Sequence, residues 1–364
     1  MKQFFLFTAL LCCTTMTTAQ DVEIATWSGF RKGAASFTFD DGAPSHITDG
    51  APLFDKYGYR ASFYLVANWN PDWEGFQALA DKGHEVGSHS NTHPQNMSGE
   101  EASSKQAIEQ KMQHPCLTVA YPNCNVPNES AVLQNYIAGR ICNGSWQGLS
   151  DDMGKNGPEN WAKVPAILTG ANGTNDFNGK MQSAVIKGGW VVFMTHGFEG
   201  KNNGMATYSP TPLSAIDAAL KWAKNNNNDI WIAPLRDVAM YIKERNASNV
   251  TLTGSTSTSK TYSLTHNISD NVCAYQYPLS LRVYDNGWTN VEVTQGEKKL
   301  ASTMEDGYIY FDAIPNGGDI VVKISTEDID NIHTTSTATK RIVNGLLLIE
   351  KNGKTINILG SQLK

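Results

Sequence analysis

Short apolar runs alternate with amphipathic stretches over most of the chain. The apolar runs are rich in β-branched and aromatic residues, as is typical of buried strands. They lie at Ala35–Phe39, Ala61–Val66, Glu85–Ser88, Leu117–Ala120, Trp190–Met194 and Ile230–Ile232. Between them, apolar residues three and four positions apart predict helices at Ile47–Tyr57, Trp73–Lys82, Gly99–Gln113, Glu129–Ala138, Ser214–Lys224 and Leu235–Glu244. This order indicates parallel strands joined by helical crossovers, in an α/β barrel or an open sheet. Ser98 and Glu101 have the spacing of a capping box, with Ser98 as the N-cap.

The pattern changes after Arg245. From Ala247 to Thr261 the chain is rich in Ser, Thr, Asn and Gly, and the helical periodicity ends. Short alternating strands are then predicted at Leu279–Tyr284, Asn290–Thr294, Gly307–Phe311 and Asp319–Ile324. We therefore expect an α/β domain over 21–246, a β-sandwich-like accessory domain over 247–335, and a short β tail module over 336–364.

The first twenty residues have the pattern of a secretory signal peptide. Lys2 precedes an apolar stretch from Phe4 to Cys13, and small or polar residues follow up to Gln20. The apolar stretch is shorter than the ~20 residues that span a bilayer. We expect an exported protein that is periplasmic, cell-surface or secreted, with no transmembrane segment.

Export changes how the cysteines are interpreted. Cys116, Cys124, Cys142 and Cys273 remain after the predicted cleavage, in a compartment where disulfides persist. Their spacing is not that of a CxxC metal site, so free thiols or one bridge among the first three are expected.

Lys and Arg number 29 against 35 Asp and Glu, a net charge of −6. Without a basic stripe, this balance argues against a nucleic-acid partner.

Polar residues cluster directly after four of the predicted strands. They are Asp40-Asp41, His89 and His93, Tyr121, and His196. In a barrel of parallel strands these ends converge on one face, which is where such folds carry out their chemistry.

The residue types at these strand ends suit a metal site. Adjacent aspartates in extended chain point in different directions, so one can bind a metal while the other faces the substrate. His89 and His93 are four residues apart, a spacing that brings two imidazoles onto one side of a helical turn. One carboxylate and two imidazoles form an open three-ligand arrangement that suits zinc. Taken alone, the aspartate pair also fits a turn or a helix cap, and the histidine pair also fits a structural role.

Two of these motifs resemble those of the polysaccharide deacetylase family, which is carbohydrate esterase family 4 with its NodB-type homology domain. Thr38-Phe-Asp-Asp-Gly42 is similar to the first motif of the family, and His89-Ser-Asn-Thr-His93 to the second. The resemblance covers roughly Arg31 to Arg245. It implies a distorted (β/α) barrel, with Asp40 as catalytic base and Asp41, His89 and His93 as ligands of a divalent metal, most simply zinc. By the same resemblance, His196 in Met194-Thr-His196 is the general acid.

The third motif departs from the family pattern. Where the family carries an arginine beside the base, this chain has Ala120-Tyr121-Pro122-Asn123. We hypothesise that Arg140, at the end of another predicted strand, takes over that task, because a nearby cation keeps an aspartate ionised. A backbone N–H near Tyr121 is expected to hold the oxyanion. Asp237 is a candidate orienting partner for His196.

The expected function is hydrolysis of acetyl groups from N-acetylated glycans of the chitin or peptidoglycan type. Two alternatives stay open: an O-acetyl esterase acting on a plant polysaccharide such as xylan, and an inactive carbohydrate-binding protein on the same fold. A peptidase would need a motif such as HExxH, which the sequence lacks. Trp69, Trp73, Trp146 and Tyr208 are aromatic residues that could stack on sugar rings. The expected partner is therefore a polysaccharide or an oligosaccharide.

Overall fold

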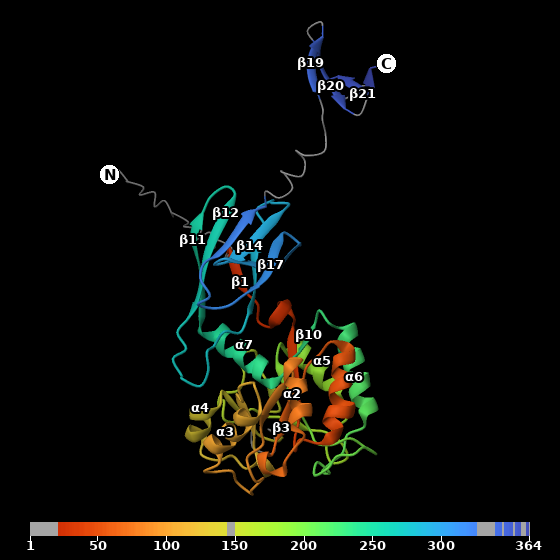
Figure 1. Ribbon diagram of the computed structural model, residues 1–364, viewed down its shortest axis with the longest axis vertical. Helices are drawn as coiled ribbons and strands as arrows, with labels where there is room; N and C mark the ends of the chain where they lie inside the picture. Colours follow the sequence, from red (N-terminus) through yellow and green to blue (C-terminus); the bar gives the residue numbers. More distant parts are fainter. Residues whose placement is uncertain are drawn as a thin grey trace, which may run out of the picture.

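The computed structural model describes residues 21–143 and 150–325, and the backbone of short strands between 339 and 363. Figure 1 shows an α/β body below a body built of strands. Trp146 and the predicted signal peptide lie outside the described residues.

A mostly parallel sheet forms the centre of the α/β body. Its central strand β2 (Gly33–Phe39) pairs along one side with β9 (Trp190–Thr195). On the other side, β10 (Ile230–Ile232) pairs with the start of β2 and β3 (Ser62–Leu65) with its end. The sheet continues through β4 (Glu85–Ser88), β5 (Thr118–Ala120) and β6 (Ala138–Arg140), all parallel. Beyond β9 lie β7 (Asp152–Met153), which is antiparallel, and β8 (Ile167–Leu168), which is parallel.

This sheet is curled. The backbone N–H of Val164 donates to Gly139 beside β6, at 2.8 Å, while β8, a few residues later, pairs with β9. One short segment thus joins strands from opposite ends of the sheet, giving a curled half-barrel of mixed α/β class, as the sequence predicted.

Helices α1 to α7 alternate with the strands and cover the sheet. Phe37 of β2 packs against Phe54 of α1 and Phe177 of α5, with ring centroids 5.3 and 5.5 Å apart. The helices are α1 (Ala51–Tyr57), α2 (Trp73–Asp81), α3 (Glu101–Lys111), α4 (Glu129–Asn135), α5 (Phe177–Lys187), α6 (Leu213–Asn225) and α7 (Leu235–Ala247).

Two local predictions for this body need correction, and one helix was missed. Helix α5 was not predicted. Helix α4 ends at Asn135, because the next residues lead into β6. The capping box is also wrong: the N-cap residue of α3 is Glu100, and the Ser98 hydroxyl donates to Asn96 instead.

The strand-built body contains two antiparallel sheets. One has the order β1 (Val22–Ile24), β13 (Leu279–Tyr284), β17 (Tyr308–Ala313), β16 (Ser302–Glu305). The other has the order β11 (Ser248–Ser255), β12 (Ser259–His266), β18 (Ile320–Ile324), β14 (Val291–Gln295), β15 (Lys298–Leu300). Residues of both sheets, such as Leu281 and Val322, belong to one buried apolar cluster. The hairpin β11–β12 and the pairing of β1 with β13 were not predicted.

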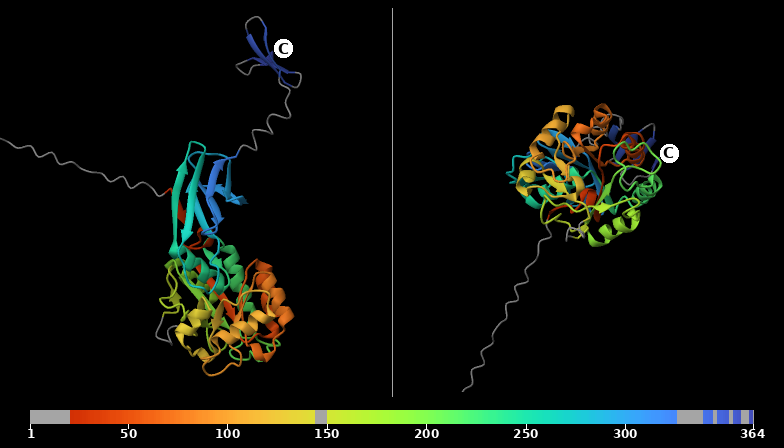
Figure 2. Two further views of the ribbon diagram at one scale, coloured as in Figure 1. Left: turned by 60° about the vertical axis from the view of Figure 1, so that its left-hand side comes forward. Right: turned by 90° about the horizontal axis from the view of Figure 1, so that it is seen from below.

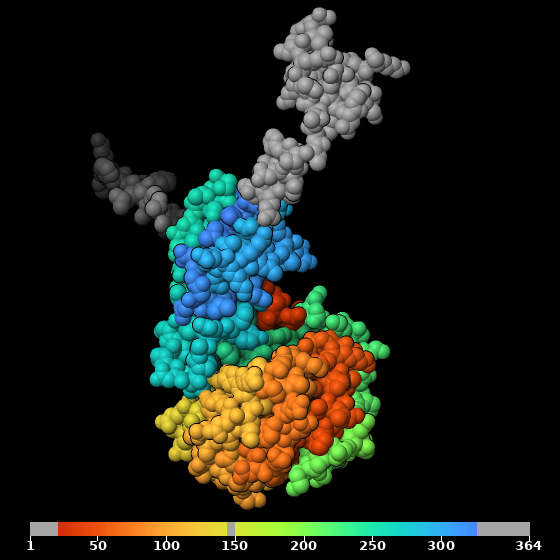
Figure 3. Space-filling view, viewed as in Figure 1, coloured from red at the N-terminus to blue at the C-terminus, as the bar shows by residue number. Residues whose placement is uncertain are grey.

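The two bodies are in direct contact. The same apolar cluster contains Trp190 and Tyr241 of the α/β body, and the Tyr241 hydroxyl donates to the carbonyl of Ala25 at 2.8 Å. Figure 2 shows α7 leading directly into β11, and in Figure 3 the red N-terminal segment reaches the surface where the bodies meet.

Four further strands form an antiparallel sheet near the end of the chain. They are β19 (Thr339–Val343), β20 (Leu346–Lys351), β21 (Lys354–Asn357) and β22 (Gln362–Leu363). Among the helices within the described ranges, none is both long and apolar enough to cross a lipid bilayer.

Candidate active site

Two neighbouring aspartates, Asp40 and Asp41, directly follow strand β2 at its carboxyl end. The backbone N–H of Asp40 donates to Thr195 at 2.8 Å and so continues the ladder with β9. Asp41 then adopts a left-handed conformation, with φ of 75°. This turn, and not the extended chain on which the sequence prediction rested, sends the two carboxylates to different partners.

Asp41 lies beside His89 and His93. Its Oδ1 atom is 3.5 Å from Nε2 of His89 and 3.6 Å from Nε2 of His93. The three candidate ligand atoms lie within 4.8 Å of one another. Nδ1 of His89 is 2.8 Å from the carbonyl of Ala120. Because a carbonyl only accepts, Nδ1 carries the proton, and Nε2 is left with a lone pair facing Asp41.

Three observations indicate that this cluster fits a divalent cation. Oδ1 of Asp41 is buried and has no hydrogen-bond partner among the described residues. Burial and the neighbouring charge of Asp40 raise the pKa of Asp41 to about 7. Burial also lowers the pKa of His89 to about 3, so this imidazole is neutral and able to coordinate. One oxygen and two nitrogen donors form a set that zinc accepts, with a position left open.

The two histidines do not lie on a helical turn, contrary to the sequence prediction. Residues 89 to 93 form a loop in which Ser90 and His93 are left-handed, with φ of 70° and 55°. The Ser90 hydroxyl accepts a hydrogen bond from the backbone N–H of His93 at 2.9 Å. The carboxylate of Glu100 accepts from the N–H groups of Asn91 and Thr92. These bonds, rather than a helix, bring the imidazoles together.

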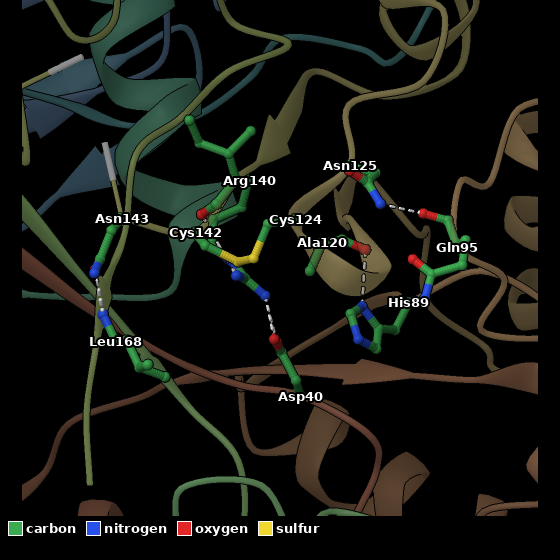
Figure 4. Close-up of a disulfide and its surroundings, with 11 residues drawn as sticks. Asp40, His89, Gln95, Ala120, Cys124, Asn125, Arg140, Cys142, Asn143 and Leu168 are labelled. Atoms are coloured by element: carbon green, nitrogen blue, oxygen red, sulfur yellow. Dashed lines mark hydrogen bonds and ion pairs between the residues drawn. A yellow bond between two sulfur atoms is a disulfide. The ribbon is translucent and has the colours of Figure 1, made fainter. Parts of the chain in front are cut away.

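Arg140 projects from β6 onto Asp40, in the position that the sequence hypothesis gave it (Figure 4). Its Nη2 atom is 2.5 Å from both carboxylate oxygens, and its side chain is fully buried. Burial acts to raise the pKa of Asp40, but the charge and the hydrogen bonds of Arg140 outweigh it, so this pKa is lowered. Asp40 is therefore held as a carboxylate.

His196 follows β9 and faces the same cavity as Asp40 and Asp41. Burial lowers its pKa. Its backbone carbonyl accepts a hydrogen bond at 2.9 Å from Nε2 of His46, whose Nδ1 accepts from the N–H of Ala43. The sequence gave no signal for His46, because its contact with His196 depends on the helical turn His46–Gly50 meeting the segment after β9 in space.

Asp237 is not the partner of His196, so that prediction is wrong. Nδ1 of His196 is buried without a hydrogen-bond partner in the described part of the chain. The Asp237 carboxylate instead accepts from Nε of its neighbour Arg236 at 2.8 Å, in a different cavity. The reason is register: β10 pairs with the start of β2 and ends level with Ala35, short of the strand end that carries Asp40.

Tyr121 forms part of the cavity wall, but its backbone N–H is not available for an oxyanion. That N–H donates to the carbonyl of Arg140 at 3.1 Å. The hydroxyl donates to Ala162 at 2.7 Å, and burial raises the pKa of the phenol. The N–H of Tyr121 itself is therefore not the oxyanion donor, and a donor near Tyr121 stays a prediction.

The polar groups line a cavity of about 580 Å³. Trp69 stacks on His93 at one side, with centroids 5.1 Å apart, and Tyr208 meets the ring of His196 at 5.3 Å. Trp73 does not line this cavity. A disulfide between Cys124 and Cys142 does line it, whereas Cys116 and Cys273 are free within the described ranges.

Together, the curled α/β sheet, the three-ligand cluster and the ion-paired carboxylate beside it define a candidate hydrolytic site on an α/β protein. Residues 28–136 match the family model described as polysaccharide deacetylase. This segment is similar to that family, in agreement with the motifs.

Individual known proteins are similar to this chain at 25% sequence identity or less. A curated gellan lyase from Bacillus sp. is 25% identical over 329 residues, which cover 83% of this chain but only 13% of the relative. The CE4 domain of a multidomain xylanase from the hindgut metagenome of Trinervitermes trinervoides is 20% identical, with a TM-score of 0.36, covering 60% of this chain and 92% of that one. A family 4 acetyl xylan esterase from Clostridium thermocellum, solved with a cobalt ion, is 16% identical, with a TM-score of 0.37 and coverages of 56% and 89%.

Proposed function

We propose that this protein is a metal-dependent carbohydrate deacetylase that releases acetate from N-acetylated glycans of the chitin or peptidoglycan type. The observation that carries the proposal is the cluster of Asp41, His89 and His93 beside the Asp40–Arg140 ion pair. The match of residues 28–136 to the polysaccharide deacetylase family supports it.

Asp41, His89 and His93 would hold the cation, and zinc suits their donor set best. When bound, the cation would act as a Lewis acid toward the acetyl carbonyl. The low pKa of Asp40 keeps its carboxylate free to accept a proton from the attacking water. Water oxygen then bonds to the acetyl carbon, and the bond from that carbon to the sugar nitrogen breaks.

His196 is the proposed acid. It shares the cavity with Asp40. Its lowered pKa makes the protonated imidazole a stronger acid than an ordinary histidine. It would give its proton to the departing nitrogen, leaving acetate and a free amine on the sugar. An O-acetyl ester, as in acetylated xylan, would need the same groups, with an alcohol as the leaving group. The side chains of Trp69 and Tyr208 would contact the glycan beside the acetyl group.

We also propose that the protein is exported, with residues 1–20 as its signal peptide. The disulfide between Cys124 and Cys142 supports this, because disulfides persist mainly outside the cytosol. We further propose that 247–335 forms a sandwich-like accessory unit and 336–364 a tail module. The two antiparallel sheets that share one apolar cluster support the first of these assignments.

The experiment is to measure acetate release from chitooligosaccharides, peptidoglycan and acetylated xylan, with zinc and after chelation. We expect zinc-dependent release from at least one N-acetylated substrate. Asp40→Asn should lower kcat by about 10²–10⁴-fold while zinc stays bound, because it removes the base but none of the proposed metal ligands. Release from xylan alone would identify the esterase instead.

Asp237→Asn is the matched control, because that carboxylate lies in another cavity. It should retain wild-type kcat. A zinc-loaded, folded protein that releases no acetate from any of the three substrates would contradict the proposal and favour a carbohydrate-binding role.

A further inference from the structure

Residues 120–125, which we call the brace loop, contact His89 and the two residues that follow His93 in the candidate metal cluster. The carbonyl of Ala120 accepts from Nδ1 of His89 at 2.8 Å. The side-chain amide of Asn123 donates to the carbonyl of Pro94 at 3.0 Å, and that of Asn125 to the carbonyl of Gln95 at 2.5 Å. Pro94 and Gln95 directly follow His93, so the loop holds the segment that carries this ligand (Figure 4).

The brace loop is also bonded covalently to the strand that carries Arg140. Cys124 forms a disulfide with Cys142, two residues after Arg140, with Cα atoms 5.2 Å apart. Figure 4 shows the disulfide overlapping, in this view, the Arg140 side chain that reaches Asp40, with Ala120 and His89 to its right. One loop therefore connects the two halves of the site: the ion-paired base and the metal-ligand cluster.

The backbone of the brace loop is held in an unfavourable conformation. Asn123 and Cys124 are consecutive left-handed residues, with φ of 52° and 62°. Asparagine tolerates this region, but cysteine rarely enters it. Such conformations persist where surrounding bonds enforce them, and they cluster at functional sites. Here the enforcing bonds are the disulfide and the two asparagine amides.

We propose that the Cys124–Cys142 disulfide is a positioning element of the site. It fixes the brace loop against β6, so that Asn123 and Asn125 keep His93 at the distance from Asp41 and His89 that one cation requires. The proposal rests on the proposed metal-dependent function, but it concerns cation affinity and can be tested apart from the reaction. The alternative is a disulfide that only destabilises the unfolded chain.

The test compares zinc affinity in full-length variants that are shown to be folded by circular dichroism. Zinc is titrated in competition with a chromophoric chelator, well below the melting temperature. The double variant Cys124→Ala/Cys142→Ala should bind zinc about 10-fold or more weakly, the loss typical of removing support from a metal ligand. Cys273→Ala, which removes a free thiol in another cavity, should bind zinc as the wild type does.

Two further measurements keep the proposal testable if the double variant does not fold. Asn125→Ala, with the disulfide intact, should also weaken zinc binding, because it frees the carbonyl of Gln95, two residues after His93. Treating the wild type with a phosphine reductant should reproduce the weaker binding. The same treatment should leave the zinc affinity of the double variant unchanged.

The outcomes separate the two claims. Wild-type zinc affinity in reduced protein and in Asn125→Ala would overturn the positioning role, even if the melting temperature falls. Weaker zinc binding in these forms, combined with no acetate release from the zinc-loaded wild type, would uphold the positioning role and reject the proposed function.

Discussion

Asp40 and Asp41 are chemically identical neighbours with opposite titration behaviour. The pKa of Asp40 is lowered, since the charge of Arg140 overcomes burial, whereas burial and the charge of Asp40 raise the pKa of Asp41 to about 7. A carboxylate that keeps its charge suits a base, and one that lacks a cationic partner suits a metal ligand. The left-handed backbone at Asp41 is what separates the two environments.

Arg140 gives the sharpest prediction at this scale. Arg140→Ala leaves Asp40 buried without its counter-charge, so we expect a loss of about 3–5 kcal/mol in the free energy of unfolding and a large fall in kcat/KM. Arg140→Lys keeps the charge but not the planar guanidinium. Its free energy of unfolding and its kcat/KM should lie between those of Arg140→Ala and the wild type. Urea unfolding and acetate release measure both effects. Arg60→Lys, on a partly exposed side chain, is the control. Wild-type kcat/KM in Arg140→Ala would refute the role.

The sequence located the residues whose position follows from their own strand. Asp40, Asp41, His89, His93 and His196 each end or follow a strand, and parallel strands bring such ends together. The predicted role of Asp237 was wrong because the position of this residue depends on the register of β10 against β2. No local sequence pattern encodes that register. The contact between His46 and His196 was missed for the same kind of reason.

At the scale of elements, β6 is packed tightly against the cavity wall. A Cβ atom added to Gly139 would lie 1.8 Å from the hydroxyl of Tyr121 and 3.2 Å from the carbonyl of Ala162. Gly139→Ala must therefore move Tyr121 or the strand that carries Arg140. We expect a loss of about 1–3 kcal/mol in stability, and reduced kcat, measured by thermal unfolding and acetate release.

Gly254→Ala is the matched control for this substitution. It also lies in a strand, and its Cβ would meet only Thr261, at 3.6 Å. It should change stability by less than about 0.5 kcal/mol. Equal stability losses in Gly139→Ala and Gly254→Ala would contradict the claim that β6 is packed too tightly to accept a Cβ atom at position 139.

Element prediction succeeded where apolar periodicity was strong and failed where turn residues interrupted it. Helix α5 has buried Phe177, Met181 and Ala184 at helical spacing, but Gly179 in its first turn weakens the local preference for helix. Its N-cap, Asp176, offsets this by accepting from the N–H of Gly179 at 2.9 Å. The hairpin β11–β12 was missed because its Ser- and Thr-rich strands are half exposed.

At the scale of the whole molecule, Glu244 joins the two bodies. Its side chain, on α7, accepts from the backbone N–H of Tyr277 at 2.8 and 3.0 Å. Burial raises its pKa to about 7. Between pH 4.5 and 7 the unfolded chain releases a proton that the folded chain retains, so this group lowers stability as pH rises.

Glu244→Gln removes that dependence. Relative to the wild type, the variant should gain about 1–2 kcal/mol in the free energy of unfolding between pH 5 and pH 8, a value reduced for solvent screening. Urea unfolding at both pH values measures the gain. Glu305→Gln, at an exposed position, should show none. A difference between Glu244→Gln and the wild type that is the same at both pH values would contradict the assignment.

The division into an α/β part and a strand-rich part was visible in the periodicity, but the way the parts are joined was not. Strand β1 lies near the start of the described chain and pairs with β13, more than 250 residues away. Pairings between such distant segments are set by the assembled core, in which Trp27, Tyr241 and Leu279 are buried together.

The central claim is that Asp41, His89 and His93 hold one divalent cation beside the Asp40–Arg140 pair. The most direct measurement is anomalous X-ray diffraction at the zinc edge, from crystals of the zinc-loaded protein. We predict one strong peak about 2.0–2.2 Å from a carboxylate oxygen of Asp41 and from Nε2 of His89 and His93. A zinc-loaded crystal with no peak at these atoms, or with its zinc held by other residues, would contradict the account.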